Sequence, residues 1–120
     1  VYPFLGALKI PLSEVKNNFR KYGLLDDQVK FLEGWFHEIL PKASFHDLSF
    51  IRIDCDTYES ILNVLDCLYP RLSVGGFLIV DDYGCFPEAR EAVHRFRDKH
   101  NSLEEIVPID WTGVYWRKTQ

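Results

Sequence analysis

Four aspartates follow two apolar segments of the chain, and they are the residues most able to do chemistry. Asp54 and Asp56 follow the first segment, and the adjacent Asp81 and Asp82 follow the second. Open α/β sheets bind ligands at the carboxyl ends of their strands, and a right-handed crossover makes successive strands parallel. We therefore expect the four carboxylates on one edge of a sheet, where their repulsion calls for a cation or a substrate. Oxygen ligands without Cys or His favour a hard ion, and Mg²⁺ fits best.

Structural roles are the alternative for the same acids. Asp56 and Glu59, three residues apart, match a capping box for a helix that starts near Thr57. Asp81 and Asp82 match solvated loop acids as well, since strand ends are often polar. Two buried strands that both end in acids favour the chemical interpretation.

Apolar periodicity predicts the elements that position these acids. Apolar runs indicate strands, and apolar residues at helical spacing indicate helices. The strands we expect cover residues 28–36, 48–54, 77–80, 103–109 and 114–117. One expected helix is capped at Ser13 and closes at Gly23, a second starts near Thr57 and is distorted or ended by Pro70, and a third has Pro87 in its first turn. Their expected inward residues are Ile61, Leu62, Leu65, Leu68 and Leu72 in the second helix, and Ala89, Ala92, Val93 and Phe96 in the third.

The order of these elements predicts an α/β sheet with helices on both faces. Residues 77–80, entered through Gly75 and Gly76, are apolar at every position, as in a strand covered on both faces. The last two strands are too close for a helical crossover, so we expect an antiparallel hairpin that turns at residues 111–113.

Composition and charge exclude several classes of function. The 120 residues are 47% hydrophobic and 15% aromatic, which suits one folded domain rather than a disordered chain. A net charge of −4 without a basic block argues against a nucleic-acid partner. No apolar run approaches the roughly 20 residues of a membrane span, so no membrane partner is expected. Three cysteines without CxxC spacing indicate neither a disulfide framework nor a zinc site, and they fit a reducing, cytoplasmic setting.

Three long segments of the chain resemble one family. Residues 17–36 (NNFRKYGLLDDQVKFLEGWF), 52–84 (RIDCDTYESILNVLDCLYPRLSVGGFLIVDDYG) and 109–118 (IDWTGVYWRK) are similar to the macrocin O-methyltransferase family. The resemblance runs from Pro11 to Lys118. It implies a Rossmann-like class I methyltransferase fold and dependence on S-adenosylmethionine and Mg²⁺. It also implies a small-molecule acceptor, methylated on a hydroxyl of a sugar or a similar natural product.

The same resemblance assigns roles to residues. Asp54 would ligate the metal and lie near the cofactor, with Asp81 and Asp82 as the other two protein ligands. Asp56 would be the general base that deprotonates the acceptor hydroxyl. The turn of Gly34, Trp35 and Phe36 would border the adenine, and Cys55 would lie in the cofactor loop, at a position where the family commonly has Gly.

The resemblance also implies that part of the fold is missing. The family's strand order is 3-2-1-4-5-7-6, and its first two strands carry a glycine-rich loop and a ribose-binding acid that this sequence lacks. We therefore expect residues 1–120 to form one domain, the C-terminal part of a methyltransferase domain: a partial open sheet with an antiparallel C-terminal hairpin. Because the chain starts with Val1, we expect either an upstream half or a truncated domain that self-associates through an exposed sheet edge. Alone, it should bind the cofactor weakly or not at all.

Two other classes of function stay open. Residues 54–57 (DCDT) also resemble the DxDxT pattern of haloacid-dehalogenase-like phosphatases, with Asp54 as nucleophile and Asp56 as acid/base, although Thr57 comes one position early and position 58 is Tyr. The interval between Asp54 and Asp81 leaves little room for the Ser/Thr and Lys motifs that such enzymes need. The other class is a non-catalytic half-domain that keeps the fold pattern without binding the cofactor.

Overall fold

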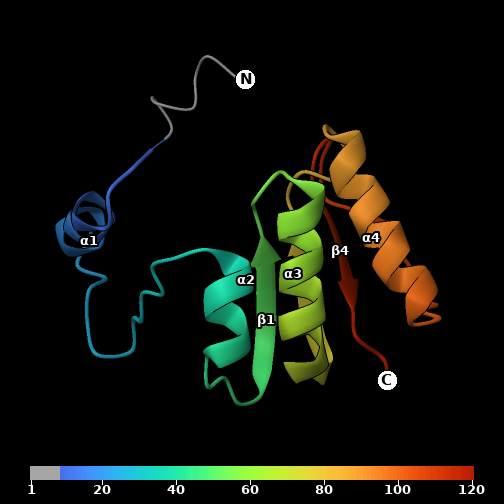
Figure 1. Cartoon of the computed structure of the whole chain (residues 1–120), viewed down its shortest axis with the longest axis horizontal. Helices are drawn as coiled ribbons and strands as arrows, with labels where there is room; N and C mark the ends of the chain where they lie inside the picture. The colour runs from blue at the N-terminus through green and yellow to red at the C-terminus, as the bar shows by residue number, and fades with distance from the viewer. Residues whose placement is uncertain (1–8) are drawn as a thin grey trace. The chain divides into compact units, whose positions relative to one another are not determined.

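The computed structural model describes residues 9–120 and divides the chain into two compact units, Val1–Gly34 and Trp35–Gln120. The first unit contains helix α1, Leu12–Lys21 (Figure 1). Pro11 occupies the N-cap position and offers no side-chain cap, so the prediction that Ser13 caps this helix was wrong. Gly23 ends the helix as expected: its φ is +67°, and its N–H donates to the carbonyl of Arg20 at 3.1 Å. The single domain expected over residues 1–120 stays a prediction.

The strand predicted over residues 28–36 does not form. Residues 28–35 are irregular, and Phe36 begins the short helix α2, Phe36–Ile39. Within the first unit, Phe31 packs edge-on against Phe19 of α1, with 5.4 Å between the ring centroids. Phe31 of this segment therefore packs against a helix, and the alternation of apolar residues does not reflect a sheet.

The second unit contains a four-stranded sheet in the order β1-β2-β4-β3. The strands are β1 Leu48–Ile53, β2 Leu72–Val80, β3 Val107–Pro108 and β4 Val114–Arg117. β1 and β2 are parallel, whereas β4 is antiparallel to both β2 and β3. The parallel pair and the C-terminal hairpin are as expected, although β3 is much shorter than the predicted residues 103–109.

Helices α3, Tyr58–Leu68, and α4, Pro87–Lys99, connect the strands. Thr57 caps α3 by accepting the N–H of Ser60 at 3.3 Å, and Pro87 is the first residue of α4. A 3₁₀ turn, Tyr69–Arg71, follows α3, so Leu72 belongs to β2 and not to the apolar stripe of the helix. Another 3₁₀ turn, Leu40–Lys42, follows α2. Among the described residues, no helix is long and apolar enough to span a bilayer.

β2 begins earlier than predicted and contains both glycines. The register between β1 and β2 shifts between Leu48 and Phe50, opposite this part of β2. Gly75 has a φ of +88°, and a Cβ on Gly76 would lie only 2.9 Å from the carbonyl oxygen of Ser49. The glycines therefore mark a local irregularity inside the strand rather than its start.

The second unit is built as one layer of helices on one face of the sheet, with α2, α3 and α4 side by side (Figure 1). The buried strand residues alternate, as a single covered face requires; they include Ile51, Ile53, Leu78, Val80, Val114 and Trp116. On the other face, Phe50 and Phe77 are 53% and 42% exposed. The prediction of helices on both faces was therefore wrong for residues 35–120. Their apolar strands reflect a second face that this unit leaves open.

Candidate metal and cofactor site

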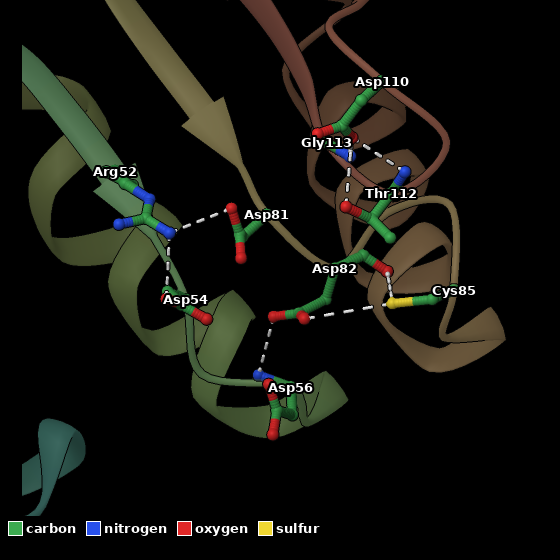
Figure 2. Close-up of polar contacts among 9 residues, drawn as sticks. All are labelled: Arg52, Asp54, Asp56, Asp81, Asp82, Cys85, Asp110, Thr112 and Gly113. Atoms are coloured by element: carbon green, nitrogen blue, oxygen red, sulfur yellow. Dashed lines mark hydrogen bonds and ion pairs between the residues drawn. The ribbon is translucent and has the colours of Figure 1, made fainter.

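Parallel pairing brings two of the acids to the same edge of the sheet. Ile53 of β1 is in register with Val80 of β2, and the N–H of Asp81 donates to the carbonyl of Ile53 at 2.9 Å. Asp54 and Asp81 thus leave neighbouring strands at the same level (Figure 2). The expectation that the acids meet at one carboxyl edge is confirmed.

Asp56 lies in the turn between β1 and α3. Its φ is +59°, a left-handed conformation that non-glycine residues rarely adopt. Its N–H donates to Oδ2 of Asp82 at 3.3 Å, which ties this turn to the segment after β2. Because Thr57 is the cap of α3, the alternative capping box of Asp56 and Glu59 was wrong. The exposed carboxyl group of Asp56 is not used as the cap of the helix.

Three carboxylates converge closely enough to hold one cation. One oxygen from each of Asp54, Asp56 and Asp82 lies within 4.8 Å of the other two. Asp82 is only 8% exposed, and this burial, together with its side-chain contact with Asp56, raises the pKa of the Asp82 carboxyl to about 6. A donor set of three carboxylates, without Cys or His, fits Mg²⁺. The side chain of Asp81 is not part of this group.

Arg52 explains the position of Asp81. Its Nη2 atom donates both to Oδ2 of Asp54, at 3.1 Å, and to Oδ1 of Asp81, at 3.0 Å (Figure 2). The hydrogen bond to Asp81 also raises the pKa of Arg52. Reasoning from the sequence missed Arg52. Its signal was present, because a charged residue two positions before Asp54 in a strand lies on the same face as that acid.

The hairpin between β3 and β4 supports the segment that carries Asp82. The N–H of Gly84 donates to the carbonyl of Thr112 at 2.7 Å, and a Cβ on Gly84 would overlap the backbone of Trp111. Asp110 fixes the hairpin turn by accepting the N–H groups of Thr112 and Gly113 at 2.9 and 2.7 Å. These backbone hydrogen bonds lower the pKa of Asp110, and the one from Gly113 has the largest effect.

Three of the predicted cofactor residues line one pocket. Phe36, Asp54 and Cys55 surround a cavity of about 210 Å³ whose other walls are Leu40, Arg52, Ile53, Val64 and Leu68. Complete small-molecule sites measure roughly 300–1,000 Å³, so this mostly apolar pocket can enclose only part of a cofactor such as S-adenosylmethionine. Trp35 lines a different cavity together with Phe36, and Gly34 belongs to the first unit.

Cys55 lines this pocket, and its surroundings disfavour the thiolate form that a nucleophile needs. Burial, followed by the charges of Asp56, Asp82 and Asp54, raises the pKa of its thiol to about 12. The sequence-based expectation that the neighbouring acids disfavour a thiolate agrees with this direction.

All residues of this site lie within the part of the chain that one family model matches. The model of the family described as macrocin-O-methyltransferase (TylF) matches residues 4–118. The chain belongs to the macrocin O-methyltransferase family. It is 54% identical to mycinamicin III 3''-O-methyltransferase of Micromonospora griseorubida, over 99% of this chain and 47% of that protein. It is 47% identical to demethyldecarbamoylnovobiocin O-methyltransferase of Streptomyces niveus, over 96% of this chain and 44% of that protein.

Solved structures agree with the family assignment. The O-methyltransferase NovP superimposes with a TM-score of 0.94 at 46% identity, over 96% of this chain and 48% of that chain. A Podospora anserina methyltransferase bound to SAH has a TM-score of 0.66 at 16% identity, over 91% of this chain and 56% of that chain, and shows the fold alone. The chain spans less than half the length of the two curated relatives and matches their C-terminal portion.

The sheet order fits this part of the class I methyltransferase fold. In the family order 3-2-1-4-5-7-6, the observed β1-β2-β4-β3 corresponds to strands 4, 5, 7 and 6. The expected class I fold without its first two strands is therefore confirmed, although residues 28–36, which were expected to form a strand, do not form one. The alternative of a haloacid-dehalogenase-like phosphatase has no support, since the family match covers the DxDxT segment.

Proposed function

We propose that this chain is the C-terminal part of an S-adenosylmethionine-dependent, Mg²⁺-assisted O-methyltransferase that acts on a sugar hydroxyl of a natural product. The relatives support the acceptor class, because they are named for natural-product acceptors: mycinamicin III for one and demethyldecarbamoylnovobiocin for the other. The observation that carries the proposal is the group of three carboxylates at the edge of the sheet, directly beside the apolar pocket that Asp54 also lines.

Asp54 and Asp82 are the proposed metal ligands that both the resemblance and the observed carboxylate group include. The resemblance adds Asp81 as the third ligand, which requires its carboxylate to leave Arg52. When bound, Mg²⁺ lowers the pKa of a coordinated hydroxyl and orients it. The carboxylate of Asp82 is buried and accepts a hydrogen bond from the N–H of Asp56, which fixes the position of one proposed ligand.

Asp56 is the proposed general base. Its carboxylate is exposed beside Asp54 and Asp82, so it can reach a proton of an acceptor hydroxyl held at those residues. S-adenosylmethionine, when bound, would supply its sulfonium methyl group to the acceptor oxygen and leave as S-adenosylhomocysteine. The role of Asp56 would be to accept the proton that the acceptor hydroxyl gives up. Holding the acceptor in line with the methyl group contributes to the rate through orientation.

Phe36 and Cys55 are proposed to border the adenine end of the cofactor, with Asp54 between that pocket and the metal. Trp35 and Gly34 stay proposals from the resemblance alone. A cytoplasmic location is likewise a proposal; all three cysteines are free thiols in the structure, as a reducing compartment would keep them.

Methyl transfer and cofactor binding test the proposal together. The protein is incubated with S-adenosylmethionine, Mg²⁺ and a panel of deoxysugar-bearing acceptors, and the mass increase of one methyl group is measured with and without EDTA. We expect Asp56→Asn to lower the rate by two to four orders of magnitude, a typical general-base contribution of about 10²–10⁴. Asp98 is an exposed acid of α4, so Asp98→Asn is the matched control and should leave the rate of methyl transfer unchanged.

Calorimetric titration with S-adenosylhomocysteine completes this test. Saturable binding that is lost when Phe36 is replaced by Asp supports the cofactor pocket. Because the pocket can enclose only part of the cofactor, the absence of both binding and transfer would refute catalysis by this chain alone and favour a non-catalytic half-domain.

A further inference from the structure

Arg52 places one nitrogen atom between two carboxylates from neighbouring strands. Nη2 lies 3.1 Å from Oδ2 of Asp54 and 3.0 Å from Oδ1 of Asp81. One cationic group thereby bridges the two acids, as a metal ion shared by both would do. The side chains are 53%, 50% and 38% exposed for Arg52, Asp54 and Asp81, so the bridge lies at the open edge of the sheet.

We propose that the Arg52 guanidinium is a resident cation of this site that competes with a divalent metal ion for Asp54 and Asp81. The inference rests on the proposed function, since it takes those two acids as metal ligands. Arg52 compensates the charge of both acids, and Asp81, which it contacts, lies outside the group of Asp54, Asp56 and Asp82. Metal binding then requires Oδ1 of Asp81 and Oδ2 of Asp54 to exchange the guanidinium for the ion.

The exchange is physically easy. Ion pairs exposed to this extent contribute little to stability, so the carboxylates lose little when Arg52 swings into solvent. While it stays, its positive charge repels a divalent cation a few ångströms away, and this repulsion is only partly screened at such short range. Removal of the charge should therefore increase divalent affinity by about three- to tenfold.

A purely positioning role makes the opposite prediction. If Arg52 served to aim Asp54 and Asp81 at the metal, removal of its side chain would weaken metal binding. The sign of the change in affinity thus distinguishes competition from positioning, and enzyme activity is not needed as the readout.

Mn²⁺ titration of the metal-free protein tests the proposal, with affinity measured by calorimetry and free Mn²⁺ followed by electron paramagnetic resonance. The variants are Arg52→Gln, which removes the charge, and Arg52→Lys, which keeps it. Arg95→Gln removes a charge from the exposed surface of α4 and is the matched control. We expect tighter binding for Arg52→Gln alone, with Arg52→Lys and Arg95→Gln within twofold of the parent. Circular dichroism confirms that each variant is folded.

Binding by Arg52→Gln that is equal to or weaker than that of the parent would overturn the proposal, and so would a failure of Arg52→Gln to bind Mn²⁺ at all. Equal tightening in Arg95→Gln would overturn it as well, because the effect would then come from net charge. The proposed function fails by a different result, namely the absence of methyl transfer and cofactor binding. Methyl transfer that persists in EDTA would leave the transferase proposal standing without this inference.

Discussion

Burial and two neighbouring carboxylates oppose the ionisation of Asp82. The free energy of unfolding, measured without metal, should therefore depend on pH. The pKa of Asp82 is about 6 in the folded chain against an ordinary value of 3.8. Between these values the folded state binds more protons than the unfolded state, so stability falls as pH rises from about 4 to 6 and then stays at the lower level.

Replacement of this acid tests the pH dependence. In metal-free buffer at pH 7.5, we expect Asp82→Asn to be more stable than the parent by on the order of 2 kcal/mol, a difference that vanishes near pH 3.5. Urea unfolding at a series of pH values measures it, with Asp98→Asn as the control. A difference that does not depend on pH would contradict a raised pKa for Asp82.

At this scale the sequence predicted the types of residues better than their partners. Asp54, Asp56, Asp81 and Asp82 could be located at one edge from strand ends alone, because parallel strands end together. The sequence could not predict which of them meet: Arg52 attracts Asp81, and the left-handed turn at Asp56 directs its N–H to Asp82. Both effects depend on the pairing of β1 with β2, which brings together residues 26–29 positions apart.

At the scale of elements, the loop after β2 depends on its contact with the β3–β4 hairpin. A Cβ at Gly84 would overlap the carbonyl oxygen of Trp111 and lie 2.9 Å from Cα of Thr112. Backbone cannot yield to such a clash without moving the loop that carries Asp82. We expect Gly84→Ala to cost about 2 kcal/mol or more of unfolding free energy and to weaken Mn²⁺ binding.

Gly113→Ala in the same hairpin is the matched control. Its Cβ would lie 3.4 Å from Oδ1 of Asp110 and 3.8 Å from the side chain of Ile109, which are ordinary van der Waals contacts, so unfolding free energy should change by less than about 1 kcal/mol. Urea denaturation and Mn²⁺ titration of both variants measure the contrast. If Gly84→Ala matched Gly113→Ala in both, the hairpin would not hold the loop.

Helices and strands were predicted correctly where local sequence signals determine the element, and incorrectly where tertiary packing determines it. Pro87 at the start of α4 and the acids after β1 and β2 are local signals, and they hold. Residues 28–36 have the alternation of a strand, yet Phe31 packs on Phe19 of α1 instead. An alternating pattern states that alternate residues are covered, and it does not state by what.

At the scale of the molecule, the second unit has an open sheet face and an edge strand, β1, with a neighbour on one side only in the described sheet. Phe50 of β1 is 53% exposed, and Phe77 beside it is 42% exposed. Exposed edges and apolar faces of this kind promote pairing with other chains. We therefore expect the isolated chain to self-associate as its concentration rises.

Sedimentation velocity between about 5 and 200 μM tests this expectation, with Phe50→Lys as the variant that places a charge on the edge strand. Its sedimentation coefficient should stay constant where that of the parent rises. Leu103→Lys, at an exposed apolar residue outside the sheet, is the control. Association unchanged by Phe50→Lys would place the contact elsewhere.

The order of the sheet was predictable because connection lengths limit how strands can neighbour one another. A helix between β1 and β2 requires a parallel crossover, and the short link between β3 and β4 requires a hairpin. Coverage of the faces was not predictable in the same way. Strands of residues 35–120 that are apolar on both sides indicate two covered faces, whereas the helices of this unit cover one.

The left-handed backbone of Asp56 has a consequence for evolution of this protein. At a φ of +59°, the backbone conformation costs aspartate about 1 kcal/mol more than glycine. Glycine at this position would also remove one negative charge from the surroundings of Asp82. A library of variants selected only for survival of heating should therefore enrich glycine at position 56, and deep sequencing of the survivors would reveal it. Such survivors would be more stable but would lack the proposed general base, so selection for stability and selection for the proposed activity favour different residues at position 56.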